Sequence, residues 1–269
     1  DRLGGKTGYC GQTAEIKAAR AALHFWEEPC ISGDNGSGTV FFSGCVLRCV
    51  FCQNRNIAES RAGREITVER LADIFLELQE KKANNINLVT PTHFVPQIAL
   101  ALERAKEAGL RIPVVYNTGS YEKADTLKRM DGLVDIYLPD MKYVSPALAQ
   151  RYSHAPDYFE TASLAVAEMV RQVGEPVFDG NTGLMKKGVI VRHLVLPGCT
   201  ADSKKVIRYL YQTYGDRIFI SIMNQYTPIG EFLESPELNR RVSRREYDRV
   251  VDFALELGVE NRSEEHTSE

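Results

Sequence analysis

The chain has 269 residues, of which 43% are hydrophobic, 26% are charged and 9% are aromatic. This composition excludes disordered, collagen-like and coiled-coil proteins, and the length allows one large hydrophobic core or two small ones. The 33 basic and 36 acidic residues give a net charge of −3, so no overall basic field favours a nucleic-acid partner.

The two ends of the chain depart from the pattern of the rest. Residues 1–38 are Gly-rich and lack an initiator Met, and they carry a single apolar stretch near positions 21–26. We expect this segment to be a truncated, irregular extension. Residues 262–269 (RSEEHTSE) resemble a translated sequencing adaptor and are predicted to be a non-native tail, with a genuine polar tail as the alternative. The predicted core domain therefore spans residues 39–261.

Short runs rich in β-branched and aromatic residues alternate with amphipathic segments from residue 39 onward. Thr67 precedes an apolar stripe at helical spacing, and Ser243 with Glu246 forms a capping box. This repetition predicts parallel strands joined by right-handed crossovers. The predicted strands are 39–43, 86–90, 112–116, 134–138, 189–196 and 217–222, and the predicted helices are 67–78, 94–108, 163–173, 200–214 and 243–257.

Two architectures fit this order: an open doubly wound sheet, and a full or partial (β/α) barrel. Both place their chemistry at the carboxyl ends of the strands. The unusual residues of this chain do follow predicted strands, which are, in order, Cys45, then Thr92 with His93, Asn117, Asp140 with Lys142, Cys199, and Asn224 with Gln225.

Three of the six cysteines, Cys45, Cys49 and Cys52, form a CxxxCxxC run directly after the first predicted strand. Three thiolates on one short loop suit a polynuclear iron–sulfur cluster in which one iron lacks a protein ligand. A mononuclear zinc site needs a fourth ligand, for which Cys30 or Cys10 is available. Clustered cysteines and the absence of a signal segment predict a reducing, cytoplasmic location. The sequence contains no apolar run of about 18 residues, so no membrane span is predicted.

The stretch 44–54 (GCVLRCVFCQN) resembles the cluster loop of radical S-adenosylmethionine (SAM) enzymes. The lead-in ISGDNGSGTVFFSGC and the segments 88–94 (LVTPTHF) and 192–198 (RHLVLPG) are similar to those of the subgroup around pyruvate formate-lyase activating enzyme. The resemblance covers residues 36–260. It implies a partial (β/α)₆ barrel of the TIM type, with a 4Fe–4S cluster on Cys45, Cys49 and Cys52.

In such enzymes one electron from the cluster cleaves SAM into methionine and a 5′-deoxyadenosyl radical. The resemblance implies hydrogen abstraction from a glycine of a partner glycyl-radical enzyme, and an electron donor such as flavodoxin or ferredoxin. Basic residues at 186–187 and 240–245 are either solvated charge or a surface for that donor. The alternatives are a radical SAM enzyme acting on a small molecule or another peptide, and a metal-binding interaction domain without enzymatic activity.

The resemblance also assigns SAM contacts. Phe51 matches an aromatic residue near the adenine, and Asp140 with Lys142 matches an Asp-x-Lys pair, for which an internal ion pair is the alternative. Thr90 and Thr92 stand where the family often has Gly-Gly-Glu. The remaining contacts are Arg192, whose charge inside an apolar strand requires a carboxylate from SAM or a nearby Asp, and Asn117, which replaces an Asp that binds a monovalent cation in relatives.

Five further positions carry weaker expectations. His93, Asn224 and Gln225 are candidates for lining the substrate or SAM, and a hydrogen-bonded turn residue is the alternative for His93. Cys199 is either a reactive thiol near the barrel mouth or an inert one. Cys10 is a candidate last ligand of a second metal site upstream, with an unpaired structural thiol as the alternative.

Overall fold

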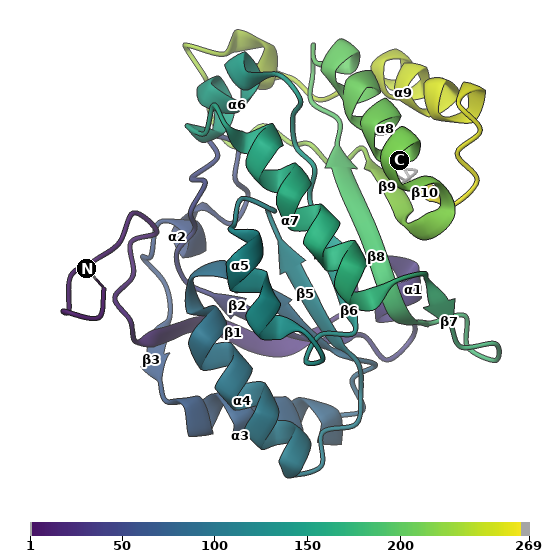
Figure 1. The fold of residues 1–269 in the computed structure, drawn as a ribbon. Coiled ribbons are helices and arrows are strands. Elements are labelled where there is room, and N and C mark those ends of the chain that lie inside the picture. The colour runs from purple at the N-terminus through teal and green to yellow at the C-terminus, as the bar shows by residue number, and fades with distance from the viewer. Residues whose placement is uncertain (1, 265–269) are drawn as a thin grey trace.

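Strands and helices alternate along the chain, as the hydrophobic pattern predicts, and the computed structural model describes residues 2–264 (Figure 1). The strands are β1 (Ile16–His24), β2 (Ser37–Phe42), β3 (Arg64–Ile66), β4 (Ile86–Val89), β5 (Val114–Thr118), β6 (Ile136–Pro139), β7 (Val177–Phe178), β8 (Met185–Leu194), β9 (Phe219–Met223) and β10 (Arg262–Glu264). The helices are α1 (Pro29–Ser32), α2 (Arg55–Ala58), α3 (Val68–Glu80), α4 (Val95–Glu107), α5 (Ala124–Leu127), α6 (Pro146–Ser153), α7 (Tyr158–Val173), α8 (Thr200–Tyr214) and α9 (Arg244–Glu256). Short 3₁₀ turns cover Thr92–Phe94, Lys128–Met130, Gly215–Arg217 and Pro236–Asn239.

The sheet order separates the two architectures that the sequence left open. Strands β2, β4, β5, β6, β8 and β9 lie side by side in chain order, and each neighbouring pair is parallel. A doubly wound sheet reverses its strand order at a switch point, and this path has none. The path ends at β3 on one edge and at β10 on the other, so the sheet is not closed. The predicted partial, TIM-like barrel is confirmed.

The predicted helix caps are present. The Thr67 side chain accepts a hydrogen bond from the Arg70 backbone N–H, and Ser243 with Glu246 forms both halves of a capping box. Helix α7 begins at Tyr158, earlier than predicted, because Tyr158 and Ala162 are both buried in the core. Figure 1 shows α4 and α7 over one face of the sheet, which leaves the strand ends free to form a site.

The expectation that the N-terminal segment is irregular is wrong, because this segment contains strand β1. β1 pairs antiparallel with β2, with Ala22 opposite Thr39, and therefore bridges the predicted boundary between residues 38 and 39. Its run IKAARAALH mixes small and charged residues because it is covered less completely than the central strands. The continuous apolar signal of a buried strand is absent for that reason.

Helix α1 lies beside the starting end of β8 (Figure 1). Its Ile31 packs against Val115, Ile136 and Ile190 on the inner side of the strands. The Asn85 side chain donates a 2.8 Å hydrogen bond to the Ile31 carbonyl at the start of β4. Residues 25–36 therefore plug the amino-terminal end of the partial barrel.

The non-native origin predicted for residues 262–269 stays a prediction, although the first three of these residues are part of the sheet. Arg262–Glu264 form β10, which pairs parallel with β9, and the Ser263 hydroxyl donates a 2.9 Å hydrogen bond to Glu28. Residues 265–269 lie outside the described residues. Within residues 2–264, no helix combines the length and the apolar character needed to cross a membrane.

Candidate functional site

The loop that follows β2 carries all three clustered cysteines. The loop begins at Gly44, whose φ of +89° suits glycine, and Arg48 within it has a φ of +53°. Leu47 and Phe51 are buried and anchor the loop to the hydrophobic core. Strained backbone held by packed side chains is typical of loops that present functional groups.

A cavity of about 190 Å³ lies at the carboxyl ends of the parallel strands. All three clustered cysteines line it, and the polar residues on the other side come from β4, β5, β6 and β8 or directly follow them. The tertiary structure thus joins the cysteine loop to most of the predicted SAM contacts. The polar residues on this side of the cavity are Thr90, Asn117, Thr118, Asp140, Lys142 and Arg192, and Asn54 lies on the side of the cysteine loop.

A chain of alternating charges runs through one wall of this cavity. Lys142 Nζ lies 2.7 Å from Asp140 Oδ2, and Arg192 Nη2 lies 3.0 Å from Asp140 Oδ1. Arg192 Nη1 lies 2.8 Å from Glu27 Oε1. These four side chains are between 11% and 19% exposed, so the two positive and two negative charges balance in a largely buried place.

The shifted pKa values follow from this arrangement. Burial by itself raises the pKa of Asp140, but the charges of Lys142 and Arg192 outweigh it and hold that pKa below its usual value. Burial by itself lowers the pKa of Lys142, and the Asp140 charge reverses this and raises it. Asp140 and Lys142 therefore stay ionised at neutral pH.

Glu27 was not among the predicted site residues. Its second carboxylate oxygen accepts hydrogen bonds from Asn87 at 2.9 Å and from Asn117 at 3.0 Å. Asn117 in turn accepts from Arg192 at 2.8 Å. Glu27 belongs to the plug segment, and no local pattern distinguishes it from its neighbour Glu28, which accepts hydrogen bonds from Ser221 and Ser263 instead.

Thr90 and Thr92, which share one predicted role, lie in different places. Thr90 lines the cavity with a φ of +58°, an unusual conformation for a β-branched residue. The Thr92 hydroxyl lies 3.3 Å from that of Thr118, outside the cavity lining. Thr118 also donates to the buried carboxyl of Glu122, a second site neighbour that the sequence analysis missed.

His93 is buried and turned toward the backbone. Its Nε2 lies 2.7 Å from the Ser43 carbonyl oxygen, so Nε2 carries the proton. Burial lowers the pKa of His93 to about 4, which makes the imidazole neutral at pH 7. His93 does not line the cavity, and a role toward SAM or substrate stays a prediction.

Phe51 is part of the cysteine loop, and its ring packs edge-on against Tyr152 and Tyr226 at centroid distances of 6.3 and 6.1 Å. Asn224 is half-buried after β9, and the exposed Gln225 accepts a 3.3 Å hydrogen bond from Gln53 through its carbonyl. These three residues are not part of the cavity lining, so their predicted contacts with ligands stay predictions.

The other cysteines lie apart from the cavity. Cys10 is buried beside the cysteine loop, and its carbonyl oxygen accepts a hydrogen bond from Ser60. Cys30 is on α1, and Cys199 Sγ lies 3.9 Å from the Tyr152 hydroxyl. Neither Cys10 nor Cys30 lines the cavity as a fourth zinc ligand would, and the second metal site on Cys10 stays a prediction.

The donor set fits an iron–sulfur cluster better than a single metal ion. Cys45, Cys49 and Cys52 are free thiols that open onto one cavity. Among the described residues, no three His, Cys, Asp or Glu side chains converge closely enough to hold one ion, whereas a cluster spaces its ligands around several irons. Burial raises the pKa of Cys49 to about 11, and the charge of Lys142 counteracts this by favouring the thiolate.

The fold and the cysteine loop define a partial TIM-like barrel with three free thiols at its strand ends. A family model described as the radical SAM superfamily matches residues 39–210. The match covers more than half of the chain, and the chain therefore belongs to this enzyme superfamily.

Two curated relatives differ in how much of the chain they match. An uncharacterized protein of Methanocaldococcus jannaschii is 28% identical over 267 residues, which are 94% of this chain and 71% of that protein. Pyruvate formate-lyase 1-activating enzyme of Escherichia coli (strain K12) is 48% identical over 31 residues, which are 12% of this chain and 13% of that enzyme. The similarity to the activating enzyme is therefore local.

Solved structures share the fold at low sequence identity. HydG, a maturase of the FeFe-hydrogenase, aligns with 82% of this chain and 49% of its own, at a TM-score of 0.54 and 14% identity. Streptococcus suis SuiB bound to S-adenosylmethionine aligns with 82% of this chain and 48% of its own, at a TM-score of 0.56 and 13% identity. This chain thus spans about half the length of these structures, and the likeness concerns the fold alone.

Proposed function

We propose that this chain is a radical SAM enzyme that holds a 4Fe–4S cluster on Cys45, Cys49 and Cys52 and cleaves SAM reductively. One observation carries the proposal: a single cavity is lined by the three thiols on one side and by the Asp140–Lys142 pair on the other. Family membership supports the same cofactors. When bound, the cluster supplies one electron to the SAM sulfonium, which yields methionine and a 5′-deoxyadenosyl radical.

Lys142 is the better anchor for the SAM carboxylate. Its ammonium has three N–H donors, and the hydrogen bond to Asp140 uses one of them. Arg192 already donates to Glu27, Asp140 and Asn117, so most of its donors are engaged within the protein. We assign Lys142 to the carboxylate and Asp140 to the amino group, and Arg192 to holding Asp140 in position.

The protein needs no acid–base pair in this chemistry, because the oxidant is the radical derived from the cofactor. Its residues position the ligands and exclude water. The buried side chains of Phe42 and Leu47 line the cavity and add an apolar surface to it. Thr90, at the end of β4, lies in the same lining and offers a hydroxyl acceptor to the SAM amino group. The six cysteines are free thiols, and we place the protein in the cytoplasm, where thiols stay reduced.

We propose a glycine of a partner protein as the site of hydrogen abstraction, with the partner becoming a glycyl-radical enzyme. The local match to pyruvate formate-lyase 1-activating enzyme supports this assignment. A reduced flavodoxin or ferredoxin is the proposed electron donor. A small molecule or another peptide in place of the glycine is the alternative that the substrate experiment below separates.

Anaerobic reconstitution tests the proposal. The reconstituted protein is reduced with dithionite and mixed with SAM, and 5′-deoxyadenosine is measured. We expect its formation by the native chain and its absence in Cys49→Ala, while Cys199→Ala serves as the matched control. An intact cluster that forms no 5′-deoxyadenosine contradicts the enzyme assignment. Deuterium transfer from labelled candidate partners into 5′-deoxyadenosine then identifies the substrate.

A further inference from the structure

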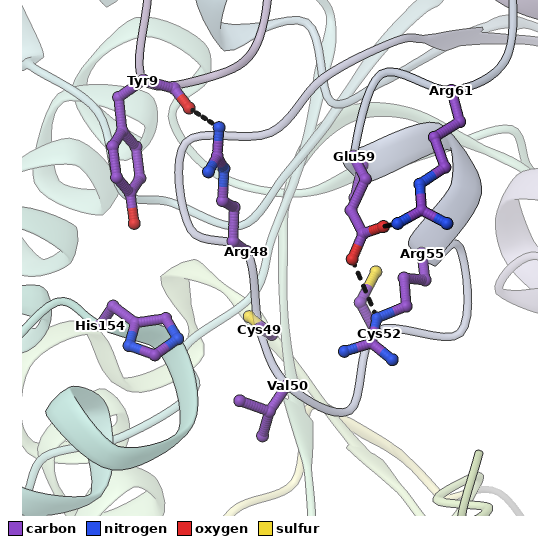
Figure 2. A pocket seen from close by; sticks show the side chains of 10 residues that line it. Tyr9, Arg48, Cys49, Val50, Cys52, Arg55, Glu59, Arg61 and His154 are labelled. Carbon is purple, nitrogen blue, oxygen red and sulfur yellow. Dashed lines mark hydrogen bonds and ion pairs between the residues drawn. The ribbon is translucent and has the colours of Figure 1, made fainter. Parts of the chain in front are cut away.

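A second, larger pocket of about 590 Å³ lies on the outer side of the cysteine loop (Figure 2). Cys49, Cys52 and Ala58 line both this outer pocket and the inner cavity at the strand ends. The cysteine loop thus borders both the proposed cluster site and this surface pocket. Nothing in the proposed SAM chemistry uses the outer pocket.

The outer pocket is strongly cationic. Arg48, Arg55 and Arg61 line it, and the only carboxylate in its lining is that of Glu59. Arg55 Nε lies 3.0 Å and Arg61 Nη2 lies 2.7 Å from the two Glu59 oxygens, so one carboxylate serves two guanidinium groups. Figure 2 shows Glu59 between these two arginines. Arg55 is 58% and Arg61 is 72% exposed, and both therefore remain available to a partner surface.

Arg48 occupies the opposite rim. Its guanidinium donates to the Tyr9 carbonyl at 2.5 Å and lies 4.7 Å from the centre of the Tyr9 ring. The exposed imidazole of His154 lies on the same side of the pocket in Figure 2. The arginines thus frame the pocket from two sides, with an excess of two positive charges over Glu59.

The linings of the two spaces indicate which occupant fits each. Abstraction of a hydrogen atom requires contact with the carbon radical, and the Asp140–Lys142 pair proposed to bind SAM lines the inner cavity but not the outer pocket. An electron needs no such contact, because it tunnels through a few covalently bonded atoms. The side chains of Cys49 and Cys52 provide that short covalent route.

We propose that the outer pocket is the docking site of an acidic one-electron donor protein, an inference that rests on the proposed cluster on Cys45, Cys49 and Cys52. Carboxylates on the donor meet Arg55 and Arg61, which steers the encounter electrostatically. One electron leaves the donor, which is oxidised by one electron, and enters the cluster, which is reduced by one. No bond is made or broken.

Two other basic segments are weaker candidates for this partner. In 240–245, both Nη atoms of Arg240 contact Glu246 at 2.7 and 2.8 Å, so its charge is neutralised locally. Lys186 lies 3.9 Å from Asp179. Neither segment contributes a residue to the inner cavity, whereas the outer pocket shares two cysteines with it.

The test uses the anaerobically reconstituted full chain and a reduced bacterial flavodoxin as the acidic probe. Binding of the flavodoxin is measured by calorimetry at low ionic strength, and cluster reduction is followed by absorbance. We expect the double variant Arg55→Glu/Arg61→Glu to weaken binding at least about tenfold and to slow cluster reduction equally, with both losses shrinking at high salt. Glu59→Gln, which removes the local carboxylate, is expected to strengthen binding.

The controls separate docking from chemistry and from folding. Arg244→Glu changes a 94% exposed arginine on α9 and is expected to leave binding unchanged. Dithionite needs no docking site, so 5′-deoxyadenosine formation with dithionite is expected to match the native chain in every variant. Arg55→Ala/Arg61→Ala repeats the test without introducing repulsion at Glu59.

Several outcomes overturn the docking site. Native flavodoxin affinity in both double variants does so, as does an equal loss in Arg244→Glu. Native flavodoxin binding combined with lost hydrogen abstraction from a partner protein assigns the pocket to the substrate instead. Failure of the native chain to form 5′-deoxyadenosine with dithionite counts against the proposed function alone, because flavodoxin binding is measured independently.

Discussion

Glu27 and Arg192 are 165 positions apart in the chain, yet Glu27 Oε1 lies 2.8 Å from Arg192 Nη1. The contact joins the plug that closes the amino-terminal end of the barrel to the strand that carries Arg192 toward the cavity. Since Arg192 also holds Asp140, the carboxylate of Glu27 acts on the cavity through two successive ion pairs. The N-terminal segment is therefore part of the site.

Glu27→Ala and Glu27→Gln are both expected to destabilise the protein. Alanine leaves Arg192 with Asp140 as its remaining carboxylate, and glutamine places an amide among donors from Asn87 and Asn117. Removing one partner from a buried pair costs about 3 kcal/mol of unfolding free energy. Urea unfolding measures the change, and Glu107→Gln, on the exposed end of α4, is expected to stay near the native value.

Each of Cys45→Ala, Cys49→Ala and Cys52→Ala is expected to lose the cluster, because the cavity lining contains no further cysteine that could replace the lost ligand. Iron and acid-labile sulfide content, with the visible absorbance, measures the loss. Cys199→Ala and Cys30→Ala are expected to keep the native content. Cys10→Ala decides the second metal site: an unchanged total metal content in this variant counts against it.

Lys142→Met is expected to weaken SAM binding about 10- to 100-fold, the range for a lost charge-assisted hydrogen bond. The variant keeps Asp140 paired with Arg192, so the fold is expected to survive. Equilibrium dialysis with labelled SAM measures the affinity on samples of equal iron content. Lys187→Met, an exposed lysine outside the cavity lining, is the control, and native affinity in Lys142→Met contradicts the carboxylate assignment.

Stability is expected to fall between pH 7 and pH 5 through His93. Its pKa is lowered from 6.5 to about 4 in the folded chain, so over this range the unfolded state takes up a proton that the folded state refuses. The loss amounts to about 2 kcal/mol at pH 5, is absent above pH 7 and stops growing below about pH 4. Urea unfolding at several pH values checks this. His93→Gln is expected to remove this component, and His154→Asn, at an exposed position, is expected to retain it.

Gly44→Ala is expected to displace the cysteine loop. At this position φ is +89°, and an added Cβ would lie 2.5 Å from the Cys10 carbonyl oxygen, which is backbone and cannot rotate away. Left-handed strain and this contact together are expected to cost at least about 2 kcal/mol of unfolding free energy and to lower the iron content. Gly230→Ala, where no atom lies within 4 Å of the added Cβ, is the matched control. Equal effects at both positions contradict the prediction.

Local sequence signals predicted the central strands and the larger helices because each depends on nearby residues. The stripe after Thr67 and the Ser243 capping box are complete within a few positions, and the structure contains both. β1 was missed because it lies toward the edge of the sheet and buries little apolar surface. Short elements such as β3 and α1 exist through pairing with distant segments, which no local pattern records.

The sequence by itself determined the family and the cysteine loop, because ligand spacing on one loop is set by the covalent chain. It also placed Asp140 and Lys142 directly after a strand, at the edge where parallel strands bring their carboxyl ends together. Only the tertiary structure decided that Glu27 neutralises Arg192 and that His93 faces the Ser43 carbonyl. These contacts depend on how the plug segment packs beneath the sheet and how each turn rotates its side chains, and both follow from the register and burial of the whole core.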